Sequence, residues 1–340
     1  MRISEISKTI VALYNNEATR NRTPYLVGPS GVGKSDSVRQ AVDLLKEQLG
    51  ECAMYDMRLS TSDPTDFGLL MPVDGELVRQ KPAFIAHMDK HPAGILFLDE
   101  ISSAPPAVQA PAYQLVLDRA CNGFEIPEGW MVVAAGNRQS DRGVTYAIAA
   151  PLLNRMTEIS VDTVLDDVLE HGAKNGLAPE VMAFLKSRAD MLHKFTKDDY
   201  GKQFPTPRSW FAVSDKLQLS LPPAARVELI CGDVGHDAGM TFEQFMRVWE
   251  TMPDINKILE DPDSVEVPEK LDVRYCVAMG LSARIDKKNF RNAYRFLKRM
   301  PREMNVLCVK LAITRDTKIA QAPAFAEEWV AENHDVFTPL

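Results

Sequence analysis

The sequence contains few cysteines, and they are not clustered. Its 340 residues include five, which are far apart and never form a C-x-x-C pair. An odd number of widely spaced cysteines fits neither a disulfide framework nor a zinc site. We therefore expect reduced, mostly buried thiols, as in proteins of the cytosol. The cysteines are Cys52, Cys121, Cys231, Cys276 and Cys308.

Long apolar runs and an excess of positive charge are also absent. No segment approaches the roughly 20 apolar residues that a membrane-spanning helix needs. The N-terminal segment 3–13 interrupts its apolar residues with Glu5 and Lys8, which indicates an amphipathic helix and not a secretory signal. Lys and Arg number 39 against 47 Asp and Glu, so the net charge of −8 gives no overall attraction to nucleic acid or anionic lipid. We expect a soluble cytoplasmic protein that does not bind membranes, in which any polyanion site is local.

Short apolar segments alternate with helical patterns in the first half of the chain. Such alternation predicts an α/β sheet that binds its ligand at the carboxyl ends of the strands. After Asp162 the strand pattern disappears and helical patterns predominate. We therefore expect an α/β core at 1–161, a helical region at 162–250 and a helical extension at 251–340. The expected strands lie at 25–27, 53–59, 95–98, 131–135 and 157–161.

The segment 25–35, YLVGPSGVGKS, joins the end of an apolar strand to a glycine-rich loop, a lysine and a hydroxyl. Glycine adopts backbone angles that other residues avoid, so such a loop can aim several N–H groups at one anion. The spacing is that of the P-loop, in which the lysine and the backbone surround phosphates and the hydroxyl binds Mg²⁺. Apolar residues at helical spacing from Val38 to Leu49 place a helix N-terminus behind the loop, which also favours phosphate. The expected phosphate-binding residues are Gly28, Pro29, Ser30, Gly31, Val32, Gly33, Lys34, Ser35 and Asp36.

Two further apolar segments end in polar side chains. GILFLDE ends in Asp99 and Glu100, and two carboxylates at the tip of a buried strand are costly unless a cation or polar ligand lies there. Beside a P-loop we expect Asp99, like Ser35, to bind Mg²⁺ and Glu100 to activate the water that attacks the γ-phosphate; a helix cap is the alternative. MVVAAGNR ends near Asn137, whose amide can bind a phosphate oxygen or that water, although Gly-Asn is also a common turn pair.

Taken in order, these motifs resemble the AAA+ ATPases and, within them, the MoxR group, over about residues 1–250. GPSGVGKS resembles Walker A, ILFLDE resembles Walker B and AAGNR resembles the sensor 1 strand. GVTYAIAAPLLNRM and TPRSW are similar to the arginine-finger and sensor 2 segments of the group. The resemblance implies a P-loop AAA+ parallel five-stranded sheet flanked by helices, an α-helical lid, a C-terminal helical extension, and hydrolysis of ATP with Mg²⁺. Ser102 and Ser103 depart from the group, which usually has Asn and a basic residue there.

The resemblance also implies roles for two arginines. Arg155 matches the arginine finger that reaches the γ-phosphate of a neighbouring subunit, and Arg208 matches the sensor 2 arginine of the lid. Either could instead be a surface salt-bridge residue. A finger supplied in trans requires a homo-oligomer, and the family forms hexameric rings, commonly with a von Willebrand A-type partner protein.

Two segments outside the core are candidates for binding a partner. PVDGEL contains an Asp-Gly pair between apolar residues, which predicts a hairpin. The resemblance implies that this region contacts a client protein, with Leu69, Leu70, Met71 and Val73 as the candidate residues, and a hairpin packed on its own domain is equally compatible. Basic residues at helical spacing over 287–302 form a stripe that could bind nucleic acid or an acidic protein, or simply face solvent.

We therefore expect an ATP-hydrolysing remodelling protein that acts as a ring on a partner protein. A slow nucleotide-dependent binding switch and a nucleic-acid-stimulated motor are the alternatives.

Overall fold

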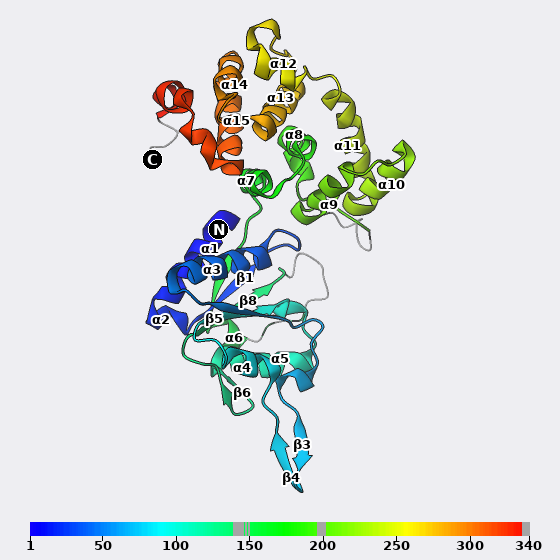
Figure 1. Cartoon of the computed structure of the whole chain (residues 1–340). Helices are drawn as coiled ribbons and strands as arrows, with labels where there is room; N and C mark the ends of the chain where they lie inside the picture. Colours follow the sequence, from blue (N-terminus) through cyan, green and yellow to red (C-terminus); the bar gives the residue numbers. More distant parts are fainter. Residues whose placement is uncertain (139–145, 147, 149, 196–201, 335–340) are drawn as a thin grey trace. The chain divides into compact units, whose positions relative to one another are not determined.

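The computed structural model of the chain describes residues 1–138, 146, 148, 150–195 and 202–334 (Figure 1). The chain divides into two compact units, Met1–Thr163 and Val164–Leu340. The first unit holds the strands of the sheet, and the described residues of the second are helical apart from turns and loops. In the described parts of the chain, no helix combines the length and the apolar character needed to cross a bilayer.

The first unit is built on a parallel five-stranded sheet with the strand order β2-β5-β8-β1-β9. Because every neighbouring pair is parallel, the carboxyl ends of all the strands meet at one edge, and the loop after β1 leaves the sheet there. The predicted α/β fold class is confirmed. The strands are β1 (Thr23–Val27), β2 (Ala53–Arg58), β5 (Gly94–Asp99), β8 (Trp130–Gly136) and β9 (Met156–Ser160).

Helices cover both faces of this sheet. Successive residues of a strand point to opposite faces, so Leu96 packs with α4 and α5, and Phe97 packs with α1 and α3. Every residue of β5 and β8 is buried, which explains why these segments read as continuous apolar runs in the sequence. The helices of the unit are α1 (Ile3–Asn15), α2 (Glu17–Arg20), α3 (Lys34–Leu49), α4 (Ala83–Met88), α5 (Pro106–Leu117) and α6 (Ala150–Leu153), with short 3₁₀ turns η1 (Pro64–Phe67) and η2 (Ile101–Ser103).

The predicted hairpin is formed by β3 (Leu70–Val73) and β4 (Glu76–Arg79), and Figure 1 shows it projecting away from the sheet. Its turn residues Asp74 and Gly75 have φ values of 51° and 87°, as the tight Asp-Gly turn requires. All residues of both strands are exposed, so the hairpin is not packed on its own domain. A second, two-residue pair, β6 (Ala120–Cys121) with β7 (Phe124–Glu125), was not predicted, because strands so short show no periodicity.

The second unit contains two apolar clusters. One gathers α7 to α11 around Phe184 and Trp210, whose ring centroids are 5.1 Å apart. The other gathers α12 to η8 around Tyr294 and Trp329. Cys276 of α13 belongs to the first cluster, so helices from both sides of the expected boundary at residue 250 share that core; the boundary itself stays a prediction. The elements are α7 (Leu165–Asn175), α8 (Pro179–Ser187), η4 (Ala189–Met191), α9 (Pro207–Leu217), α10 (Pro223–Val234), α11 (His236–Trp249), α12 (Ile255–Glu260), η6 (Pro262–Ser264), α13 (Leu271–Arg284), α14 (Phe290–Leu297), α15 (Arg302–Arg315), η7 (Thr317–Gln321) and the π-helix η8 (Phe325–Val330).

The cysteines are free thiols, and four of the five are buried. Burial raises the pKa of Cys52 and of Cys121 to about 11. Because the thiolate is the reactive form, these side chains act as small apolar residues of the core.

Candidate nucleotide-binding site

The loop between β1 and α3 has a shape that requires its glycines. Gly31 and Gly33 have φ values of 75° and 101°, in the left-handed region that other residues rarely adopt. Gly28 is needed for space, because a Cβ there would lie 2.9 Å from the carbonyl oxygen of Val161. The side chain of Val32 packs in the core cluster formed by α1, α3 and the sheet and is only 4% exposed, which fixes the position of the loop.

Lys34 begins α3, and its side chain lies across the loop. Its Nζ donates hydrogen bonds to the carbonyl oxygens of Gly28 at 2.6 Å and Pro29 at 2.7 Å, and to Oδ1 of Asn137 at 3.1 Å. The ammonium is therefore held among neutral oxygens between the loop and the end of β8. The first N–H groups of a helix have no partner within the helix, so those of Lys34, Ser35 and Asp36 add to the positive field. An ammonium and a helix N-terminus at one point favour a phosphate group.

Ser35 and Asp99 bring two oxygens together beside Lys34. The hydroxyl of Ser35 donates to Oδ2 of Asp99 at 2.9 Å. Asp99 is only 6% exposed, and this burial raises its pKa, although the hydrogen bonds from Ser35 and from the N–H of Glu100 act in the opposite direction. Hydroxyl and carboxylate oxygens are the ligands that Mg²⁺ prefers, so these residues fit a magnesium ion bound with phosphates.

Glu100 is held in an unusual backbone conformation. Its φ of 58° lies in the left-handed region, and its N–H donates to Oδ1 of Asp99 at 2.9 Å. Strained residues of this kind are concentrated at functional sites. The carboxylate of Glu100 accepts a hydrogen bond from the hydroxyl of Ser60. Sequence reasoning missed Ser60, because it belongs to no motif and reaches Glu100 only through the pairing of β2 with β5, in which Arg58 lies opposite Asp99.

Asn137 follows β8 and is fixed through its backbone. Its N–H donates to Oγ of Ser102 at 3.0 Å, and Ser102 is only 4% exposed. The hydroxyl of Ser102 also lies close to the backbone of Gly136, because a Cβ at that position would be only 2.9 Å from the same Oγ. Ser102, which the sequence marked only as a departure from the MoxR pattern, therefore connects the end of β5 to the end of β8.

The structure brings Lys34, Ser35, Asp99, Glu100 and Asn137 together at one edge of the sheet. Among the other expected phosphate-binding residues, Asp36 is exposed and pairs with Arg39 at 2.9 Å.

Arg155 is not part of this cluster. It is exposed and donates to the carbonyl oxygen of Leu117 at 3.0 Å. It precedes Met156, which lies opposite Thr23, the first residue of β1, whereas the phosphate loop follows the last residue of that strand. At about 3.3 Å per residue, the four steps from Thr23 to Val27 place the two ends of β1 roughly 13 Å apart. Arg155 is thus at the opposite edge of the sheet from Lys34.

Arg208 belongs to the second unit, where it is the second residue of α9 and is exposed. In the segment that resembles the arginine-finger region, residues 143–145, 147 and 149 lie outside the described residues.

Residues 25–156 match the family described as AAA domain (dynein-related subfamily). No curated protein matches the chain.

Three solved structures illustrate the likeness to known folds. The RuvB Holliday junction branch migration motor of Thermotoga maritima is 15% identical, with 87% of this chain and 86% of that chain covered and a TM-score of 0.38. NtrX from Brucella abortus is 16% identical, with 92% and 67% covered and a TM-score of 0.42. PCH-2 of C. elegans is 12% identical, with 87% and 70% covered and a TM-score of 0.35.

The family match spans the phosphate loop, the strand that ends in Asp99 and the strand before Asn137. Residues 25–156 of the first unit are therefore similar to this AAA domain family.

Proposed function

We propose that the chain is an ATPase of the MoxR type, which hydrolyses the bond between the β- and γ-phosphates of ATP. The observation that carries this proposal is the position of Lys34, whose ammonium joins the phosphate loop to Asn137 beside the Ser35–Asp99 pair. The loop amides and Lys34 would bind the phosphates, and Ser35 and Asp99 would hold Mg²⁺. Bound Mg²⁺ supplies positive charge that stabilises the phosphate oxygens.

In the proposed reaction, water attacks the γ-phosphorus, the bond to the bridging oxygen of ADP breaks, and ADP and inorganic phosphate leave. Glu100 orients the water and accepts its proton. Asn137 orients the same water or a γ-phosphate oxygen by hydrogen bonding. In the structure one oxygen of Glu100 is already engaged by Ser60, so the carboxylate must leave that partner, or share it, to act as the base.

The position of Arg155 favours an oligomer. It lies at the edge of the sheet opposite the phosphate loop of its own unit, so an arginine finger at this position must serve another subunit. A contact that uses different surfaces of two identical chains is head to tail, and such a contact either closes into a ring or continues as a filament. We propose a hexamer in which Arg155 completes the site of the next subunit, and in which Arg208 contacts the nucleotide from the lid.

The partner of such a ring would be a protein. The β3–β4 hairpin exposes Leu70 and Leu77 at 50% and 72%, which is unusual for apolar side chains unless they bind something. We propose that the hairpin contacts a client protein and that a von Willebrand A-type protein assists, as the likeness to the MoxR group suggests.

A nucleic-acid motor is less well supported. The basic residues of α14, and Lys298 directly after it, form ion pairs within the second unit: Arg295 with Asp263, Arg291 with Glu328 at 3.3 Å, and Lys298 with Glu332 at 2.5 Å. Carboxylates therefore offset the charge that phosphates would need.

Measuring the ATPase rate against protein concentration tests the proposal. We expect a steep rise with concentration, because each site needs two subunits. Glu100→Gln and Arg155→Ala subunits should each be inactive alone, and mixing them should restore part of the rate, since each supplies what the other lacks. An equal mixture of wild type with Arg39→Ala, an exposed arginine of α3, serves as the control. Strong ATP binding with no turnover at any concentration would instead indicate a nucleotide-dependent switch.

A further inference from the structure

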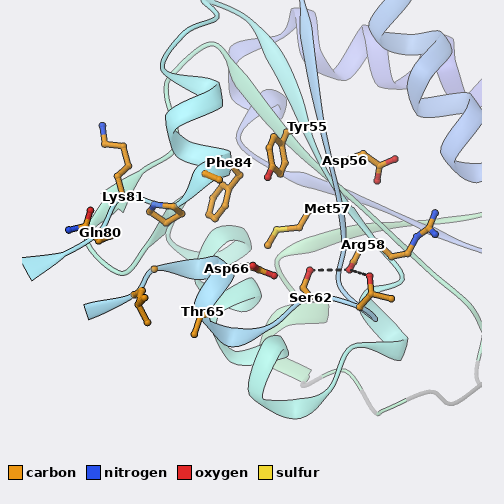
Figure 2. Close-up of a pocket in the computed structure, with 15 residues that line it drawn as sticks. Tyr55, Asp56, Met57, Arg58, Ser62, Thr65, Asp66, Gln80, Lys81 and Phe84 are labelled. Carbon is orange, nitrogen blue, oxygen red and sulfur yellow. Dashed lines mark hydrogen bonds between the residues drawn. The ribbon is translucent and has the colours of Figure 1, made fainter. Parts of the chain in front are cut away.

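A cavity of about 460 Å³ lies at the base of the β3–β4 hairpin (Figure 2). It is formed by β2, the turn that follows, η1, both ends of the hairpin and the start of α4. This volume is within the usual range for ligand pockets. None of the residues that hold the phosphate-binding loop lines it, so it is separate from the candidate nucleotide site.

The apolar part of the cavity comes from buried and half-buried side chains. Met57 and Phe84 are 6% and 1% exposed, and Tyr55 packs against Phe84 with ring centroids 6.2 Å apart. Figure 2 shows these three side chains directed toward the same space. They offer a surface for an aliphatic stem and two aromatic rings near it.

Charged residues around the cavity do not all point into it. Residues alternate along β2, so Asp56 and Arg58 face the side opposite to Tyr55 and Met57; Asp56 accordingly binds Arg39 of α3 at 3.1 Å. Lys81 binds Asp89 at 2.7 Å and points away from the cavity in Figure 2.

Asp66 is the carboxylate that faces the cavity. Figure 2 shows it beside Met57 and Ser62, and its charge acts on Tyr55, whose pKa is raised by burial and, to a smaller extent, by Asp66. Its Oδ2 accepts from the N–H of Asp63 at 2.8 Å, which fixes the side chain through η1. A fixed carboxylate near aromatic rings attracts a cation, and the apolar wall suits a cation with a long aliphatic stem.

The cavity opens onto the exposed apolar surface of the hairpin. Leu69 and Gln80 line it, and the N–H of Gln80 donates to the carbonyl oxygen of Leu69 at 2.8 Å, where the hairpin begins. Met71 and Val78 are directly opposite each other in the hairpin and are 45% and 41% exposed. By alternation they share a face with Leu69, which is 45% exposed. An apolar strip therefore continues from the mouth of the cavity.

We propose that this cavity binds an arginine or lysine side chain of an extended polypeptide whose neighbouring apolar residues lie on the hairpin. The cation is held by Asp66 and the rings of Tyr55 and Phe84, and its stem lies against Met57. This inference rests on the proposed function in that it names the kind of segment by which a partner protein is recognised. It does not depend on the rate of ATP hydrolysis.

Binding of two fluorescein-labelled peptides to the full chain tests the proposal, by fluorescence anisotropy without nucleotide. One peptide alternates leucine and alanine around a central arginine, and the other has citrulline, which is neutral and has nearly the same shape, in its place. We expect the arginine peptide to bind about fivefold more tightly, as a partly exposed ion pair with an aromatic contact allows. Equal affinities, or no saturable binding of either peptide up to about 1 mM, would overturn the proposal.

Two variants test whether Asp66 causes the preference for the arginine peptide over the citrulline peptide. Asp66→Asn removes the charge but keeps an oxygen to accept from Asp63, and it should bring the ratio of the two affinities close to one. Asp74→Asn, at the hairpin tip, removes a carboxylate outside the cavity and should leave the ratio unchanged; asparagine suits its positive φ. A preference that persists in Asp66→Asn would overturn the assignment, provided that thermal unfolding shows both variants to be folded.

Competition with agmatine separates a peptide from a small cation. Agmatine carries the guanidinium and stem of arginine without flanking residues, so we expect it to compete only at much higher concentration than the unlabelled arginine peptide. Equal potency would overturn the peptide assignment. The ATPase rates of the wild type and of Asp66→Asn, measured without peptide, should be equal. Normal hydrolysis without a preference for arginine would contradict only the cavity proposal, whereas the absence of hydrolysis in the wild type would contradict the proposed function.

Discussion

The backbone N–H of Asn137 donates to the hydroxyl of Ser102 at 3.0 Å, so the residue that follows β5 by three positions fixes the residue that follows β8. The side chain of Asn137 in turn accepts from Lys34 at 3.1 Å. Ser102 thus acts on the phosphate loop through Asn137, without touching that loop in any of these contacts.

Ser102→Ala should therefore impair turnover more than binding. Losing the hydroxyl removes the acceptor of the Asn137 N–H, a change of about 1 kcal/mol, and kcat should fall about fivefold with a smaller change in KM. Steady-state ATPase assays measure both constants. Ser103→Ala, the adjacent hydroxyl, is the control, and Ser102→Thr should recover part of the rate. Equal losses in the two alanine variants would contradict a positioning role for Ser102.

Removing the hydroxyl of Ser60 should raise the basal ATPase rate, in contrast to the loss expected for Ser102→Ala. Ser60→Ala frees the carboxylate of Glu100 from its hydrogen bond, so more of the protein has the base available, and we expect a rise of about two- to tenfold. The matched variant is Ser62→Ala, whose hydroxyl lies in the same turn but donates to the carbonyl oxygen of Arg58 at 3.0 Å. A lower rate in Ser60→Ala would mean that Ser60 holds Glu100 in its working position.

Asp99→Asn should stabilise the protein in the absence of nucleotide and Mg²⁺ while abolishing Mg²⁺-dependent hydrolysis. Burial raises the pKa of Asp99 in the folded state, so ionisation of this carboxyl costs more in the folded than in the unfolded chain. The ionised carboxylate of Asp99 therefore lowers the stability of the folded protein. This loss of stability disappears as the pH falls below 3.8, the pKa of an aspartate in the unfolded chain, because the carboxyl is then protonated in both states.

Thermal unfolding between about pH 4 and pH 8 measures this difference. The gain in Tm from Asp99→Asn should be largest at neutral pH and should shrink as the pH falls. Asp43→Asn, on the exposed side of α3, should show no such trend. A gain independent of pH would show that the charge of Asp99 is not its cause.

The basic stripe over 287–302, which includes α14, should contribute little to nucleic-acid binding. Its ion pairs are exposed, with Arg295 and Asp263 at 53% and 59%, so Arg295→Ala and Lys298→Ala should each lower Tm by less than about 3 °C. Duplex DNA should leave the ATPase rate of the wild type unchanged at low salt. DNA stimulation that falls with salt and is lost in Lys298→Ala would favour the motor instead.

Several features of the fold could be predicted because they depend on neighbouring residues alone. The phosphate loop is recognisable from its glycine spacing, and the structure shows why Gly31 and Gly33 are required there. The hairpin follows from Asp74-Gly75, which favours one tight turn. Strands β5 and β8 were evident because burial on both faces makes them apolar throughout.

The contacts of the site that were not predicted join residues from different strands. Ser60 meets Glu100 only because β2 pairs with β5 in one register, and Ser102 meets Asn137 because β5 lies next to β8. The basic stripe likewise was visible in the sequence, but its acidic partners come from η6 and from the C-terminal helical segment.

Local backbone preference and apolar periodicity were enough to predict the phosphate loop, the main strands and helices in their order along the chain, and the polar residues at the strand ends. The packing of the folded unit was needed to learn which of those residues meet, that Arg155 lies at the far edge of the sheet, and that Asp66 faces a cavity with Tyr55. The position of each strand in the sheet and its register depend on burial over the whole unit, and no local pattern contains that information.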